Sequence, residues 1–335
     1  MLTDPVTGFK YPDAWVAACT MPELIDDITK GLCVLTASGT VLRRGYTTGT
    51  TAAAACKAAV LSLASPVTSV SISIPGGLTL LIPAEGRTGR GIAVKFSGDY
   101  PTDVTSELEF VAMASPAKDG ITLTAGKGIG RFTRDMPRYQ ADSPAISTAA
   151  RDYILASIRE AVEEAELSGA EVEISIPRGE GIAAKTLNSR LGIVDGISIL
   201  GTTGLVEPWD DHVNESITER IKGLNKVVIT TGRIGLRYSR LMFPDHEAVL
   251  VGTRIKRALE AASGSIILCG MPGLILKFID PDIVGKTGRG SVQEIMLSPE
   301  WEAIVQSRLR RFKILRPDVR VVLIDHEGKV VGDSG

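Results

Sequence analysis

The sequence has few cysteines and histidines, and they lie far apart. Its four cysteines (Cys19, Cys33, Cys56 and Cys269) form no Cys-x-x-Cys pair, and only three histidines occur in 335 residues. Structural zinc sites need such ligands in clusters, and disulfide frameworks need paired cysteines in a secreted chain. The sequence therefore predicts reduced thiols, no protein-bound metal and a cytoplasmic protein.

Long apolar runs and blocks of positive charge are also missing. No stretch approaches the roughly 20 apolar residues that span a bilayer. The first residues, MLTDPVTGFKYPDAW, lack the basic start and apolar core of a signal peptide. The formal net charge is −2 and no Lys/Arg-rich run occurs, so we expect neither a membrane nor a nucleic-acid partner. A homo-oligomer remains possible.

What is present is the composition of a globular protein, with 44% hydrophobic and 23% charged residues. Because 335 residues is long for one core, two domains are expected. We predict an N-terminal arm at 1–40, an α+β domain with a mixed sheet at 41–190, and a Rossmann-like parallel α/β domain at 191–335. The predicted fold class is therefore α/β and α+β.

Hydrophobic patterns support this division. Residues 69–75 alternate strictly and lead through Gly76-Gly77 into 78–84, which predicts a β-hairpin. Further strands are expected at 91–97, 108–114, 120–126 and 171–177, with a long helix at about 147–168. From Gly196 onward, short apolar strands at 197–200, 226–230, 248–252, 265–270 and 320–325 alternate with helical stretches, which is typical of a parallel, helix-covered sheet.

The stretch LRRGYTTGTTAAAACKAAV, residues 42–60, has two interpretations. Its alanines predict a helix, which Thr48 or Thr50 would cap, and a plain capped helix explains the hydroxyls. Alternatively, the helix N-terminus and its neighbouring cations form a site for a carboxylate or phosphate. The cations in question are Arg43, Arg44 and Lys57.

Glycine-rich turns suggest where a cofactor would bind. SILGTTGLVEP, residues 198–208, is expected at the carboxyl end of the first strand of the second domain, where open α/β sheets bind ligands. TTGRIGLRYSR, residues 230–240, has the same predicted position, whereas TAGKGIGRFT, residues 124–133, lacks a following helix. No carboxylate ends the strand AVLVGTR, so an NAD enzyme is disfavoured, and Glu207 is the acid available for ribose hydroxyls.

Several stretches together resemble the CbiD family, the cobalt-precorrin-5B C1-methyltransferases of anaerobic cobalamin biosynthesis. LRRGYTTGTTAAAACKAA is similar to the family's opening signature, and KTLNSRLGIVDGISILGTTGLVEP, residues 185–208, to its longest motif. Weaker similarities are GDYPTDVT, GKGIGRFT and IPRGEGIAAKT. The resemblance implies a two-domain enzyme that transfers a methyl group from S-adenosylmethionine to C1 of cobalt-precorrin-5B, giving cobalt-precorrin-6A. The cobalt would arrive within the substrate.

The implied substrate and methyl donor suggest roles for particular residues. The carboxylates of the tetrapyrrole would be bound by the helix start and the domain junction, and Asp99 would orient C1 or assist deprotonation, although an Asx turn also explains Asp99. The predicted substrate-binding residues are Arg43, Arg44, Thr47, Thr48, Thr50, Lys57, Asn188 and Arg190. The methyl donor would bind at Gly201, Thr202, Thr203, Gly204, Glu207, Gly232 and Gly235.

Two other functions stay open. Met271 stands where the family usually has histidine, which favours a paralogue that binds an anionic tetrapyrrole without this methyl transfer. A phosphoryl transferase fits the Thr/Gly helix start, but the sequence lacks G-x-x-x-x-G-K-[ST].

Overall fold

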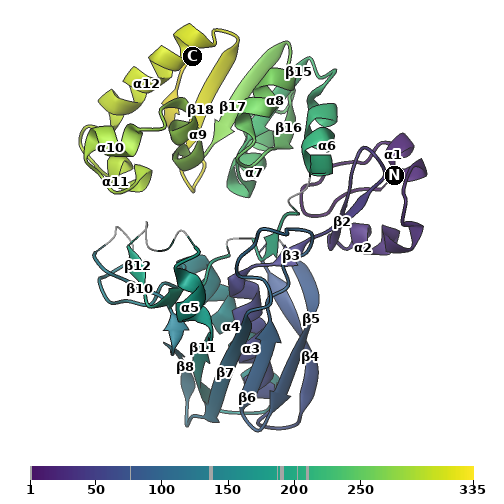
Figure 1. The fold of residues 1–335 in the computed structure, drawn as a ribbon, viewed down its shortest axis with the longest axis vertical. Helices are drawn as coiled ribbons and strands as arrows, with labels where there is room; N and C mark the ends of the chain where they lie inside the picture. Colours follow the sequence, from purple (N-terminus) through teal and green to yellow (C-terminus); the bar gives the residue numbers. More distant parts are fainter. Residues whose placement is uncertain are drawn as a thin grey trace. The chain divides into compact units, whose positions relative to one another are not determined.

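The computed structural model describes residues 2–75, 77–135, 139–186, 188, 192–201, 203–208 and 211–335. The chain divides into two compact units. Unit 1 contains residues 1–20, 36–40 and 211–335, and unit 2 contains residues 21–35 and 41–210. The fold is mixed α/β with several sheets (Figure 1).

Unit 2 is built on a six-stranded mixed sheet of order β4-β5-β6-β7-β11-β8. Its strands are β4 (Val67–Ile74), β5 (Leu78–Arg87), β6 (Arg90–Val94), β7 (Glu109–Pro116), β8 (Gly120–Ala125) and β11 (Gly169–Ser175). The predicted hairpin is confirmed, because β4 and β5 pair antiparallel with Ile74 opposite Leu78. Within this sheet only β8 and β11 pair in parallel, and the connection between them contains the helix α4 (Thr148–Glu164).

The helix α3 (Thr48–Leu61) packs against one face of this sheet, which curves around it. It contacts β4, β5, β6, β7 and β11, while α4 contacts both edge strands, β4 and β8. The sheet thus curls around α3, and every residue from Gly49 to Leu61 is buried. Small residues on both elements let α3 and β6 approach each other closely. A Cβ added at Gly91 of β6 would lie only 2.1 Å from the carbonyl oxygen of Ala55 in α3.

Short elements complete unit 2. They are η1 (Pro22–Leu24), α2 (Ile25–Thr29), β1 (Cys33–Leu35), β2 (Val41–Arg43), β3 (Gly45–Tyr46), β9 (Gly128–Ile129), β10 (Arg131–Phe132), α5 (Gly179–Ala183), β12 (Ile193–Val194), β13 (Gly196–Ile197) and β14 (Leu205–Val206). They pair as β1 with β2, β10 with β12, β13 with β9, and β14 with β3.

Unit 1 contains a five-stranded sheet of order β16-β15-β17-β18-β19, parallel except at β19. Its strands are β15 (Lys226–Thr230), β16 (Glu247–Leu250), β17 (Ser265–Gly270), β18 (Val319–Ile324) and β19 (Val330–Asp333). Its helices are α1 (Asp13–Ala17), α6 (Asp211–Ile221), α7 (Arg233–Met242), α8 (Ile255–Ala261), α9 (Pro272–Ile279), α10 (Ile283–Thr287), α11 (Val292–Met296) and α12 (Trp301–Leu315). The parallel strands have apolar side chains on both faces, which form two core clusters.

One predicted strand of this parallel sheet is wrong. Residues 197–200 were expected to open it, but Ile197 pairs with Ile129 in unit 2, and the parallel sheet contains β15 to β18 instead. A short apolar run does not specify its strand partner, and here hydrogen bonds to residues 128–130 decide it.

No helix in the described part of the chain is long and apolar enough to span a membrane. Among the same residues, no group of three or more His, Cys, Asp or Glu side chains is placed to hold a metal ion.

Candidate functional site

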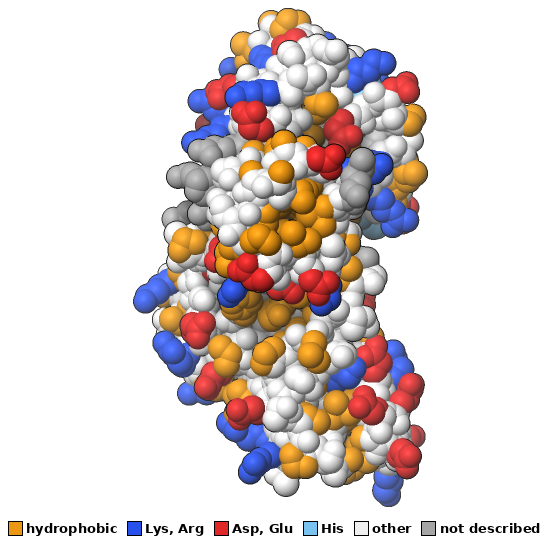
Figure 2. All heavy atoms as spheres, turned by 90° about the vertical axis from the view of Figure 1, so that its right-hand side faces the viewer, with side chains coloured by type: hydrophobic (Ala, Val, Ile, Leu, Met, Phe, Trp, Pro, Cys, Tyr) orange, Lys and Arg blue, Asp and Glu red, His pale blue; other side chains and the backbone are white. Residues whose placement is uncertain are grey.

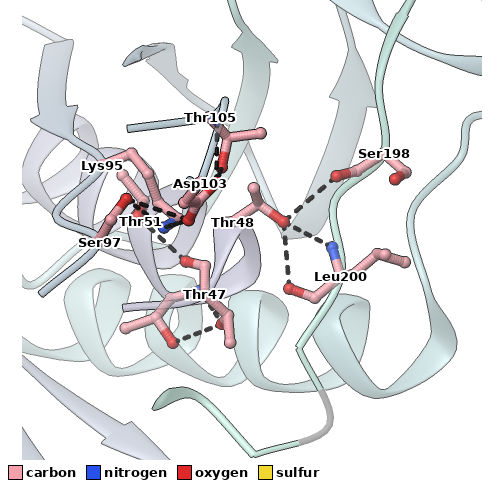
Figure 3. A network of polar contacts seen from close by, with 10 residues as sticks. Thr47, Thr48, Thr51, Lys95, Ser97, Asp103, Thr105, Ser198 and Leu200 are labelled. Carbon is pink, nitrogen blue, oxygen red and sulfur yellow. Dashed lines mark hydrogen bonds and ion pairs between the residues drawn. The ribbon is translucent and has the colours of Figure 1, made fainter. Parts of the chain in front are cut away.

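The start of α3 is capped by its own chain. Thr47 is the N-cap, and its Oγ1 accepts a hydrogen bond from the Thr50 amide at 3.2 Å. The Thr50 hydroxyl donates to the Gly204 carbonyl at 2.7 Å, and the Thr48 hydroxyl accepts from the Leu200 amide at 2.8 Å. The Gly49 amide donates to the Leu200 carbonyl, also at 2.8 Å. Figure 3 shows the Thr48 side chain directed at Ser198 and Leu200.

The segment 196–208 therefore wraps around the start of α3. Besides these bonds, Leu205 pairs with Tyr46 between β14 and β3. The Arg44 guanidinium completes the contact, with its Nε 2.9 Å from Glu207 Oε2. The two longest motifs of the sequence, more than a hundred residues apart, thus form one structural cluster in unit 2.

This arrangement favours the capped-helix interpretation over the anion site. The hydroxyls of Thr47, Thr48 and Thr50 and the amides of Gly49 and Thr50 are all engaged by the chain. An incoming carboxylate would have to displace the Thr47 hydroxyl and the carbonyls of Leu200 and Gly204, which already accept hydrogen bonds from these donors.

The cations predicted to bind substrate also require correction. The side chain of Arg44 is 1% exposed, and its Nη1 donates to the carbonyls of Gly31 and Cys33 as well as pairing through Nε with Glu207. Lys57 is buried in the third turn of α3, where it bonds to the Ser71 carbonyl and to Glu160 of α4 at 2.6 Å. Nine residues of helix place it about 13 Å from Thr48. Both side chains stabilise the core of unit 2, and Arg43 stays exposed.

The remaining predicted substrate residues differ in position. Asn188 is buried, donates to the Gly196 carbonyl at 3.0 Å and accepts from the Ser198 hydroxyl at 3.1 Å, so it orders the strand β13. Asp99 is exposed, and its Oδ2 accepts from the Arg43 amide at 2.6 Å. Arg190 and Thr202 lie outside the described residues.

A second carboxylate in the same motif as Asp99 is more deeply placed. Asp103 pairs with the Nζ of Lys95 at 2.9 Å and accepts from Ser97 and Thr105 (Figure 3). Lys95 is 1% exposed, and burial lowers the pKa of its ammonium group although Asp103 opposes this. Burial acts to raise the pKa of Asp103, but hydrogen bonds from Thr105 and Lys95 outweigh it and hold that pKa below its usual value.

Neither this ion pair nor Tyr153 was among the site residues predicted from the sequence. The alternation of GIAVKFS puts Lys95 on the same face as Gly91 and Ala93, which was a signal for an inward lysine. The Tyr153 hydroxyl lies 3.3 Å from Thr47 Oγ1, and burial raises the pKa of this phenol. Nothing in the helical pattern of 148–164 singles out Tyr153.

The glycine-rich turns fall in different units. Gly201 belongs to unit 2, where a Cβ would lie 2.4 Å from Thr47 Oγ1, so it permits the wrapping of α3. Gly204 and Thr203 belong to the same segment, 196–208, that surrounds the start of α3. One carboxylate oxygen of Glu207 accepts a hydrogen bond from Arg44, so Glu207 does not offer both oxygens to a ribose. This corrects their predicted position at the end of a strand in the parallel sheet.

Gly232 and Gly235 are where they were predicted. They follow the carboxyl end of β15 in unit 1 and begin α7. Gly232 is the N-cap, no side chain caps this helix, and a Cβ at Gly232 would meet no atom within 4 Å. The neighbouring strand β17 leads in the same way into α9, whose N-cap Met271 also makes no side-chain cap. Unlike the start of α3, the starts of α7 and α9 thus have no side-chain cap, and space is free beside Gly232.

A groove with a cavity volume of about 1040 Å³ runs along β5 and β6 of unit 2. Tyr46 and Phe96, with ring centroids 5.7 Å apart, and part of Lys95 contribute to its walls. Its charged lining residues are of both signs: Glu85, Glu107, Glu109, Arg87 and Arg90. Figure 2 shows the face of unit 2 formed by β4 and β5. Basic and acidic side chains are interspersed on this face.

Comparisons with known proteins agree on one family. The family model described as CbiD matches residues 35–208. A relative from Methanoculleus marisnigri, named cobalt-precorrin-5B C(1)-methyltransferase, is 54% identical over 99% of this chain and 99% of its own length. A relative of the same name from Methanoregula boonei is 53% identical over 99% of this chain and 100% of its own. The crystal structure of the cobalamin biosynthesis protein cbiD from Archaeoglobus fulgidus superposes with a TM-score of 0.75 at 33% identity, covering 97% of this chain and 100% of that one.

Proposed function

The chain belongs to the CbiD family, and on that basis we propose that it is a cobalt-precorrin-5B C(1)-methyltransferase. It transfers a methyl group to C1 of cobalt-precorrin-5B, and the product is cobalt-precorrin-6A. The observation that carries this proposal is identity of 54% and 53% across nearly the whole length of relatives with that name.

We propose S-adenosylmethionine as the methyl donor. When bound, it supplies an activated methyl group on a sulfonium, whose departure as a neutral thioether needs no acid. Alignment of the donor with C1 then accounts for much of the rate, because positioning replaces a costly bimolecular encounter. This chemistry suits a chain whose partly buried carboxylate Asp103 is engaged with Lys95 and Thr105.

The donor's proposed place is the open strand end of unit 1, which we interpret as a Rossmann-like domain. Ligands of parallel α/β sheets bind beyond the carboxyl ends of the strands. The amides at the start of α7 suit the donor's carboxylate, and the free space beside Gly232 suits its adenosyl group. Thr231 and Gly270, next to each other at the ends of β15 and β17, would form the floor.

Among the predicted unit 2 residues that the structure describes, Arg43 and Asp99 keep exposed side chains beside the α3 start. Two hydrogen bonds join these residues. The Arg43 amide donates to the Asp99 carboxylate, and the Asp99 amide donates to the Arg43 carbonyl at 2.9 Å. We retain Arg43 as a substrate contact and Asp99 as the group that orients C1.

The test is an assay of the purified chain with S-adenosylmethionine and cobalt-precorrin-5B, read by product mass. A corrinoid product heavier by one methyl group, with the label at C1 when the donor carries ¹³C, supports the proposal. Binding of the tetrapyrrole without any methylated product contradicts it and favours the non-methylating paralogue.

A further inference from the structure

The parallel strands β8 and β11 of unit 2 end at the same edge of their sheet. They pair over their full common length, from Gly169 opposite Gly120 to Ile174 opposite Ala125. The chain leaves this edge through residues 126–135 after β8 and residues 176–186 after β11. Together, β8, α4 and β11 form a β-α-β unit, and the carboxyl ends of such strands are where α/β sheets bind ligands.

These two loops are locked together through their main chains. The Ile176 amide donates to the Lys127 carbonyl at 2.9 Å. Gly128 has a φ of +76°, and a Cβ there would lie 1.9 Å from the Ile176 carbonyl oxygen, so only glycine fits. A Cβ at Gly179 would lie 2.1 Å from the Gly128 carbonyl oxygen. The helix α5 contacts β9 and β13, and Figure 1 shows it beside β11.

The locked loops present an excess of positive charge, which we call the basic loop surface. Its members are Lys127, Arg131, Arg178 and Lys185, all exposed. Within the described residues, Lys127, Arg178 and Lys185 form no ion pair, and Arg131 donates to the main-chain carbonyl of Asp142 at 2.9 Å. The carboxylates on or beside these loops are Glu173, close to Gly126, Glu180 on α5, Asp142 beside Arg131, and Asp135, whose Oδ1 accepts from the Ala141 amide at 2.9 Å.

This surface differs from two other places in unit 2 that carry cations. At the start of α3 the guanidinium of Arg44 is buried and paired. In the groove along β5 and β6, Arg87 and Arg90 share the lining with three glutamates. On the basic loop surface, by contrast, Lys127, Arg178 and Lys185 are exposed and form no ion pair with the described carboxylates.

We propose that the basic loop surface binds the peripheral carboxylates of an anionic tetrapyrrole. The inference rests on the proposed function for the class of ligand. Carboxylates spread around a macrocycle match several cations on a rigid, glycine-locked edge, because each contact is charge-assisted and no loop has to be ordered. The contacts with the peripheral carboxylates thus come mainly from the loops after β8 and β11, in addition to Arg43, and not from the capped first turn of α3.

The experiment measures the binding of uroporphyrin, a polycarboxylate tetrapyrrole, to the full chain by fluorescence titration. Lys127→Glu and Arg178→Glu should each weaken binding roughly three- to tenfold, and the double variant more. Lys118→Glu is the matched control, because it makes the same charge change at an exposed site before β8, at the opposite end of that strand. Raising the salt concentration should weaken uroporphyrin binding to the wild type. It should also reduce the difference in uroporphyrin affinity between the wild type and the charge-reversal variants.

Equal weakening by Lys118→Glu would show a non-specific charge effect and overturn the inference. Loss of binding in Arg90→Glu, with Lys127→Glu unchanged, would also overturn it and place the ligand in the groove. Cobinamide, whose side chains are amides, should bind more weakly than uroporphyrin, and stronger binding of cobinamide contradicts the carboxylate match.

The same variants separate this inference from the proposed function. If the wild type methylates cobalt-precorrin-5B but Lys127→Glu and Arg178→Glu bind uroporphyrin normally, the inference fails and the function stands. If the wild type forms no methylated product but shows the expected binding pattern, the surface stands and the methyltransferase proposal fails.

Discussion

The Nε of Arg44 lies 2.9 Å from Oε2 of Glu207, although 163 residues separate them in sequence. This ion pair joins the strand before α3 to the end of the segment that wraps its first turn. The arginine is almost fully buried, whereas the glutamate side chain is 37% exposed. Arg44 therefore holds two motifs together rather than facing a ligand.

Glu207→Ala should destabilise unit 2. Removing the carboxylate leaves a buried guanidinium without this partner, and we expect a loss of about 2–3 kcal/mol, below the 3–5 kcal/mol for fully buried pairs. Urea denaturation measures it, with Arg43→Ala as the exposed control that should change stability by less than about 0.5 kcal/mol. Normal stability of Arg44→Ala combined with weak uroporphyrin binding would instead restore Arg44 as a substrate contact.

Gly91→Ala should be costly because its Cβ would meet the Ala55 carbonyl oxygen at 2.1 Å. Either α3 or β6 has to shift, and overpacking of this kind costs about 1–3 kcal/mol. Thermal unfolding measures the loss. Gly181→Ala in α5 is the control, since a Cβ there meets nothing within 4 Å and should leave the midpoint unchanged or raise it. Equal midpoints for the two variants would mean that α3 does not pack as closely as described.

Asp103→Asn should lower stability in a pH-dependent way. The pKa of Asp103 is lower in the folded chain than in the unfolded one, so its stabilising contribution is present above about pH 4 and is lost as pH falls through the folded value. The difference in unfolding free energy between wild type and variant should therefore shrink from neutral to acidic pH. Denaturant titrations at neutral and at acidic pH measure this difference in unfolding free energy. Asp119→Asn, at an exposed turn, is the control. A difference that grows on acidification would contradict the assignment.

Gly232→Val should weaken donor binding without unfolding unit 1. Its Cβ enters open space at the start of α7, where we place the donor, and calorimetry with S-adenosylmethionine should show at least a tenfold loss. Gly285→Val in α10 also enters open space and should bind normally.

Gly235→Ala, at the same strand end, should affect the stability of unit 1, whereas Gly232→Val should affect donor binding. A Cβ at Gly235 would lie 2.1 Å from Thr230 Oγ1 and 3.1 Å from the Gly270 Cα. This variant should lower the unfolding midpoint, because α7 could no longer pack against β15 and β17. Full donor affinity in Gly232→Val would refute the proposed place of the donor.

Local patterns in the sequence determined much of this protein. The alanine run set α3, strict alternation set the β4–β5 hairpin, and two long motifs set the family. These features depend on residues adjacent in sequence, so hydrophobic period and propensity suffice to read them.

Tertiary structure decided which polar groups stay available. Arg44, Lys57 and the threonines at the start of α3 were the expected ligand contacts, but partners far along the chain bind them: Glu207, Glu160 and the carbonyls of Leu200 and Gly204. A buried cation must be paired, and a helix start must have its amides satisfied, yet the sequence does not reveal whether a ligand or the chain does so. The same holds for residues 197–200, which joined β9 because hydrogen-bonding partners, and not apolar character, decide which sheet a short strand enters.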